Sequence, residues 1–95
     1  MITAIVMIDA ATDSIPEVAA AVADLDGVSE VYSVAGDVDL VALVRVHEFD
    51  DIATVVAGQI NKVPGVLHTA THVAFRAYSR HDLESAFSLG FESTD

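Results

Sequence analysis

Hydrophobic residues recur along the chain with two different spacings, which predict strands and helices. Four apolar segments rich in β-branched residues have the composition of β-strands. They are residues 2–8, 28–34, 38–46 and 66–77. In two further segments an apolar residue recurs every three or four positions, as in an amphipathic helix. They are residues 16–24, with the stripe Ile15, Val18, Val22 and Leu25, and residues 50–63, with the stripe Ile52, Val55, Val56 and Ile60.

The ends of both helices carry sequence signals. Ser14 followed by Glu17 has the spacing of a capping box, and Gly27 is placed to end the first helix. Acidic residues from Asp50 onward suit the positive end of the second helix dipole. Pro64–Gly65 is expected to end that helix.

The order strand, helix, strand, strand, helix, strand predicts the fold class. A short connection at Gly36–Asp37 makes the second and third strands a hairpin. The segments Leu25–Val28 and Val63–Val66, which start 38 residues apart, each lead from a helix into a strand. Two such halves predict an α+β fold, the ferredoxin-like βαββαβ sandwich with two helices on one face of the sheet. Ser79 with Asp82 predicts an extra C-terminal helix.

The sheet is expected to be apolar on both faces. In the third strand the apolar residues alternate, with Leu40, Ala42, Val44 and Val46 on one side and Val41 and Leu43 on the other. The first strand also reads as a central strand buried on both faces. Two helices cover only one face, and exposing the other costs roughly 25 cal/mol per Å² of apolar area. We therefore expect an obligate dimer packed sheet against sheet, in the dimeric α+β barrel arrangement.

Composition and charge restrict the kinds of molecule that the chain can bind. The 95 residues, enough for one domain, include 15 acidic and 4 basic side chains and have a net charge of −11. Such a chain repels phosphates, which excludes direct nucleic-acid binding and makes an anionic membrane an unfavourable partner. It contains no cysteine, no apolar stretch near the ~20 residues of a membrane span, and no signal-peptide pattern at its start. We expect a soluble, cytoplasmic protein.

The histidines are the first candidates for chemistry. His68 and His72 share one face of the fourth strand, where residues four apart stand about 13 Å from each other. One metal ion cannot easily bridge that separation. Surface or interface histidines are therefore favoured over metal or haem ligands.

Two further groups of polar residues have both a structural and a functional interpretation. Asp37 and Asp39 flank Val38 and supply either turn geometry or an acidic rim for an ammonium group. Thr69 and Thr71 share one face of their strand, opposite the histidines. They reflect strand propensity, or they form a hydroxyl pair that holds a small zwitterion.

These segments, taken in order, resemble the ligand-binding and oligomerisation (RAM) domain of the Lrp/AsnC transcription regulators. The resemblance covers roughly residues 1 to 77. It rests on the turn Gly36–Asp39 leading into Leu40–Val44, on Val63–Val66, and on the pair Thr69 and Thr71. Residues 1–95 would then be a single stand-alone domain without the DNA-binding domain that precedes it in full-length regulators.

The resemblance implies an effector-binding module that is not an enzyme. Family members form dimers through their sheets and often larger, octamer-like rings, and they bind amino acids between dimers. The family's ligand residues map here onto Gly36, Asp37, Val38, Asp39, Thr69, Ala70 and Thr71. The partners implied are an amino acid or similar metabolite, further copies of the chain, and a full-length Lrp/AsnC relative. No cofactor or metal is implied.

A small dimeric α+β barrel enzyme, monooxygenase-like or haem-handling, is the alternative. Such enzymes share the strand order and work in the cavity between helices and sheet. Apart from the histidine pair, the chain offers few polar residues there, and it contains no nucleophile elbow, P-loop or dinucleotide fingerprint. The amino-acid-binding ACT domain shares the topology but is normally fused to an enzyme. We therefore expect no catalytic activity.

Overall fold

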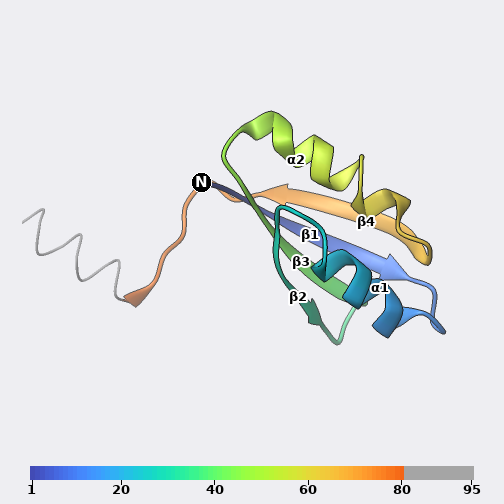
Figure 1. The fold of residues 1–95 in the computed structure, drawn as a ribbon. Helices are drawn as coiled ribbons and strands as arrows, with labels where there is room; N and C mark the ends of the chain where they lie inside the picture. The colour runs from blue at the N-terminus through green and yellow to red at the C-terminus, as the bar shows by residue number, and fades with distance from the viewer. Residues whose placement is uncertain (81–95) are drawn as a thin grey trace, which may run out of the picture.

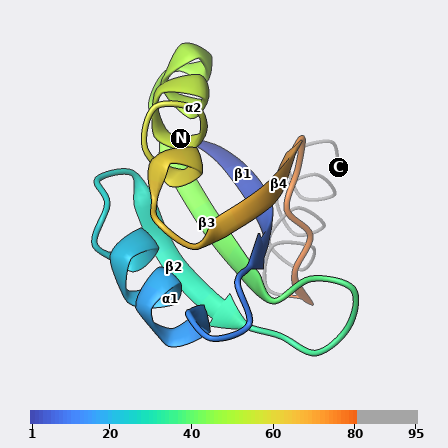
Figure 2. The same ribbon diagram turned by 90° about the vertical axis from the view of Figure 1, so that its right-hand side faces the viewer.

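The computed structural model describes residues 1–80, which form a four-stranded antiparallel sheet with two helices on one side (Figures 1 and 2). The elements in chain order are β1 (Ile2–Ala10), α1 (Ile15–Ala23), β2 (Val28–Ser33), β3 (Leu40–Val46), α2 (Phe49–Val56), the 3-10 turn η1 (Ile60–Lys62) and β4 (Val66–Val73). The predicted ferredoxin-like βαββαβ sandwich is confirmed. In the described part of the chain, no helix is long and apolar enough to cross a membrane.

The strands lie in the order β2-β3-β1-β4, so β1 is central and both β2 and β4 are edge strands. β1 pairs antiparallel with β3 on one side and with β4 on the other. Ile8, for example, lies between Leu40 and Thr69. The predicted hairpin of β2 and β3 is also present.

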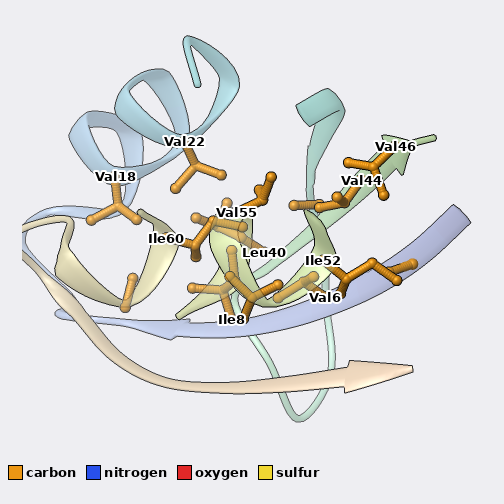
Figure 3. Close-up of a cluster of buried hydrophobic side chains, with 14 residues drawn as sticks. Val6, Ile8, Val18, Val22, Leu40, Val44, Val46, Ile52, Val55 and Ile60 are labelled. Carbon is orange, nitrogen blue, oxygen red and sulfur yellow. The ribbon is translucent and has the colours of Figure 1, made fainter. Parts of the chain in front are cut away.

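The core lies between the sheet and the helices, as Figure 3 shows. Val18 and Val22 of α1 point toward the sheet, which presents Val6 and Ile8 of β1, and each of these side chains is 0% exposed. The predicted stripe of the second helical segment is buried as well, namely Ile52, Val55, Val56 and Ile60. Within residues 1–80, all the buried side chains are apolar.

The opposite side of the sheet carries no helix, and we call it the open face. Alternation along the paired strands places on it Thr3, Ile5, Met7 and Asp9 of β1, Val41, Leu43 and Arg45 of β3, Glu30 and Tyr32 of β2, and His68, Ala70 and His72 of β4. Its apolar centre is half-buried at Ile5, Met7, Val41 and Leu43. β1 is therefore central, as predicted, but buried on one face only within a single subunit.

A β-bulge interrupts the pairing of β1 with β4. Asp9 lies opposite His68 and the next residue, Ala10, lies opposite Val66, so Leu67 is the extra residue. The bulge turns Val66 toward the core, against which it packs, and leaves Leu67 70% exposed. This is the usual effect of one inserted residue on the alternation of a strand.

One predicted capping bond and two predicted boundaries were wrong. Ser14 is the N-cap of α1, but its side chain makes no cap hydrogen bond; its hydroxyl donates to Asp13 Oδ1 at 3.2 Å. α2 ends at Val56, just before the poor helix former Gly58, and η1 follows. β4 ends at Val73, which lies opposite Ala4 of β1, rather than at Ala77. The predicted C-terminal helix falls on residues 81–95, outside the described part.

Candidate functional site

The turn between β2 and β3 is tied to the end of β1 through Asp39. The Asp39 N–H donates to Ile8 O at 3.0 Å, and the Ala10 N–H donates to Asp39 Oδ2 at 2.9 Å. Gly36 has φ +128, a conformation that side chains rarely adopt. Asp37 is exposed and Val38 is half-buried. Asp37 and the second oxygen of Asp39 therefore remain available as acceptors.

The threonine pair lies on the helix side of the edge strand β4. Thr69 pairs with Ile8 and Thr71 with Val6, both of which point into the core. The Thr69 hydroxyl donates to Asn61 Oδ1 at 2.6 Å. Thr71 lines an otherwise mostly apolar groove of about 260 Å³ between β4 and α2, whose α2 side includes the 62%-exposed Phe49. Both hydroxyls therefore lie at the outer edge of the sheet.

Within the chain, the strand β1 separates the two groups of predicted site residues. The Gly36–Asp39 turn leads into β3 and the threonines lie on β4, with β1 between those strands. Ala70 lies opposite Met7 on the open face, turned away from Thr69 and Thr71. The register places Leu40, which follows Asp39, and Thr69 on either side of Ile8, so one strand separates the two segments.

The histidines lie as the sequence predicted. His68 and His72 share the open face, where they pair across the strands with Asp9 and Ile5. Within residues 1–80, no three His, Cys, Asp or Glu side chains are grouped so that they could hold a metal ion. Because no polar side chain of those residues is buried between helices and sheet, that interior supplies no group for acid–base chemistry.

Sequence reasoning missed Asn61 and Phe49. Asn61 lies in η1 and meets Thr69 only because the chain turns back into β4 at Gly65, which has φ +96. No local pattern links residues eight positions apart across such a turn. Phe49 carried a weak signal, since it is a large apolar residue at the polar start of a helix.

Comparison with known proteins identifies the family of the chain. The family model described as the Lrp/AsnC ligand binding domain matches residues 3–83. An uncharacterized HTH-type transcriptional regulator of Pyrococcus horikoshii is 39% identical over 59 residues, which are 62% of this chain and 39% of that protein. The chain therefore spans well under half the length of this curated relative.

Solved structures share the fold. TTHA0845 of Thermus thermophilus is 45% identical with a TM-score of 0.79, over 84% of this chain and all of that one. The feast or famine regulatory protein of M. tuberculosis, complexed with L-methionine, is 27% identical with a TM-score of 0.69, over 84% of this chain and 54% of that one. AsnC of E. coli, at 19% identity and a TM-score of 0.76 over 82% of this chain and 53% of its own, shows the fold alone.

Proposed function

Because this chain belongs to the Lrp/AsnC ligand-binding domain family, we propose that it binds a free amino acid and couples binding to the assembly of its own copies. It works in the cytoplasm as an effector module rather than an enzyme. One observation carries the proposal. The acidic turn and the threonine pair lie on either side of β1, and we propose that a second copy of the chain brings the two segments into one site.

The chemistry of the two segments suits the two ends of an amino acid. Asp37 is exposed, and one oxygen of Asp39 is held by the Ala10 N–H, so both residues offer oxygens to an α-ammonium group. The Thr69 hydroxyl already donates to Asn61, which leaves the Thr71 hydroxyl as the donor toward an α-carboxylate. Charge-assisted hydrogen bonds of this kind are the stronger ones in proteins.

Two relatives support the proposal. The M. tuberculosis regulator is complexed with L-methionine, and it is 27% identical over 84% of this chain. The relative from P. horikoshii is an HTH-type regulator. With its net charge of −11, this chain is unsuited to direct DNA contact, so its signal passes through a protein partner. A full-length member of the family is the partner we propose.

The open face gives assembly a structural basis. Ile5, Met7, Val41 and Leu43 form an apolar patch that the chain's own helices do not cover. We propose that a second copy covers it, sheet against sheet, and that dimers associate further into an octamer-like ring. Ligand sites that include Gly36–Asp39, Thr69 and Thr71 then form between subunits, with Ala70 turned toward the sheet-to-sheet contact.

Light scattering after size exclusion, with and without each common amino acid, tests the function. We expect at least one amino acid to increase the molar mass and to release heat in calorimetric titration. Asp37→Asn and Thr71→Ala should each weaken that binding by about tenfold or more, since each removes a bond to a charged group. Thr54→Ala, an exposed threonine on α2, is the matched control and should bind normally. Neither heat nor a mass change with any amino acid would overturn the proposal.

A further inference from the structure

The open face is positively charged at one end and negatively charged at the other. Thr3, at the start of β1, lies opposite Arg45 of β3, so that end of the face carries a guanidinium group. Asp9 lies at the opposite end of β1, where it pairs with His68 of β4. At about 3.3 Å per residue of strand, the two charges stand roughly 20 Å apart along the sheet. The apolar patch of the open face lies between them.

The positive end of the open face is also hollowed. A hollow of about 400 Å³ lies between the start of β1, the end of β3 and the segment that follows β4, and both Arg45 and Arg76 line it. The Ala74 N–H donates to Thr3 O at 2.9 Å, which holds that segment beside β1. Two of the chain's four lysines and arginines therefore lie at one end of this face, in a chain with 15 acidic residues.

The charges at the two ends of the open face are not neutralised by their own surroundings. Within residues 1–80, the side chains of Arg45 and Asp9 form no hydrogen bond or ion pair. Glu30, on the edge strand β2, accepts a hydrogen bond from the Tyr32 hydroxyl. Asp9 is nevertheless half-buried. Because burying a carboxylate further is costly unless a cation meets it, a molecule that covers this face must supply a positive charge at Asp9.

We propose that the second copy lies on the open face with its strands running in the opposite direction, so that Arg45 of each copy meets Asp9 of the partner subunit. Reversal about the middle of β1 places Thr3 over Asp9 of the partner subunit. Sheets packed in the aligned class keep their strands within about 30° of each other, so the long arginine side chain can span the remaining offset. The hollow beside Arg45 and Arg76 then receives the acidic end of the partner's β1.

The opposite arrangement, with the strands of both copies running the same way, is disfavoured by charge. It would bring the two Arg45 side chains together at one end and the two Asp9 side chains together at the other. Like charges opposed across an interface select strongly against an arrangement. The apolar centres coincide in both arrangements, so the charges decide the direction. This orientation rests on the sheet-to-sheet assembly proposed above and adds its direction and the two residues that set it.

Complementary charge reversals test the orientation. Arg45→Glu and Asp9→Arg each turn both Arg45–Asp9 contacts of the symmetric dimer from attractive to repulsive. Each variant alone should therefore associate about a hundredfold more weakly than the parent chain. An equimolar mixture of the two variants restores opposite charges at both contacts and should associate as tightly as the parent chain. Sedimentation velocity of the full chain, without any amino acid, measures the dissociation constants.

Two further variants make the test specific. Lys62→Glu, at an exposed position in η1, changes the net charge by the same amount as Arg45→Glu and is the matched control. It should associate nearly as tightly as the parent chain. Arg45→Gln removes the charge without reversing it and should weaken association by about tenfold. Far-UV circular dichroism should be the same for every variant.

The outcomes separate the orientation from the assembly on which it rests. A parent chain that stays monomeric at every concentration would overturn both. A parent chain that dimerises, with variants that associate equally well or a mixture that stays as weak as the single variants, would overturn the orientation and leave the assembly intact. An equal loss in Lys62→Glu and Arg45→Glu would also overturn it, because net charge alone would then explain the effect.

Discussion

The two faces of the sheet both have an apolar centre, but only one of them is covered by helices. On β1, Val6 and Ile8 point to the helices and are fully buried, whereas their neighbours Ile5 and Met7 point to the open face and are half-buried. The helix-covered face is completed within one chain. The open face is apolar at its centre, at Ile5, Met7, Val41 and Leu43, and in the described part of the chain it carries no helix. Alternation along one strand thus specifies a core on one side and an uncovered, partly apolar surface on the other.

The largest difference between the faces should appear in stability. Ile8→Ala removes a fully buried side chain beneath the helices and should lower the free energy of unfolding by about 4 kcal/mol. Met7→Ala, on the open face, should cost less than half of that at low protein concentration, where assembly contributes little. Urea unfolding of both variants at several protein concentrations checks this. Equal losses at the lowest concentration would show that the faces do not differ.

The next effect should fall on assembly alone. Met7→Lys places a charge at the apolar centre of the open face and should weaken self-association on the order of a hundredfold, about 2.7 kcal/mol. Far-UV circular dichroism should stay unchanged. Light scattering gives the molar mass, and Thr54→Lys, exposed on α2, is the control. If Met7→Lys assembles like the parent chain, then the open face is not the contact surface.

Substitution of two glycines distinguishes the cost of a steric clash from the cost of backbone strain. Gly65 has φ +96, and a Cβ there would lie 2.7 Å from Val18 Cγ2 of α1. Gly36 has φ +128 with open space around it. Gly65→Ala should cost about 3 kcal/mol and Gly36→Ala only about 1 kcal/mol, since the latter carries strain without a clash. Thermal unfolding of the pair measures the difference, and equal midpoints would contradict it.

The smallest effect concerns Tyr32 on the open face. Its hydroxyl donates to the Glu30 carboxylate, and this bond raises the pKa of Tyr32 above its usual value of 10.0. The bond exists only while the phenol is protonated. Its contribution to stability is therefore complete below pH 10 and is lost as the pH rises through the raised pKa.

Glu30→Gln should bring that pKa back toward its usual value. Absorbance at 295 nm follows the titration, in a Tyr78→Phe background because the chain has two tyrosines. An unchanged titration curve in Glu30→Gln would show that the carboxylate does not hold the proton.

Local patterns predicted most of the fold, and the remainder depended on distant pairing. The stripe Val18 and Val22 and the alternation of Leu40 with Val41 are properties of single segments, and both were confirmed. The end of β4 was not predictable from its own residues, because strand pairing depends on β1, which lies some seventy residues earlier in the chain. The predicted capping bond of Ser14 is absent, and the Ser14 hydroxyl donates to Asp13 instead.

The two segments of the candidate site could be predicted from the sequence, but their positions relative to each other could not. The turn Gly36–Asp39 and the pair Thr69 and Thr71 are each visible in the sequence. Their separation by β1 follows from strand order, which no single segment encodes. Asn61, the partner of Thr69, was missed for the same reason. Whether two copies unite the segments remains the prediction that the scattering experiment addresses.

The bulge at Leu67 is a position where the chain can lose or gain one residue without changing which way the rest of β4 faces. Deleting Leu67 would bring Val66 next to His68, and every other residue of β4 would keep the face it now occupies. Evolution can therefore add or remove one residue here without turning the threonines away from the helices. Alignments of relatives should place single-residue gaps at this position rather than in the strand beyond it, where one lost residue would reverse the remaining side chains.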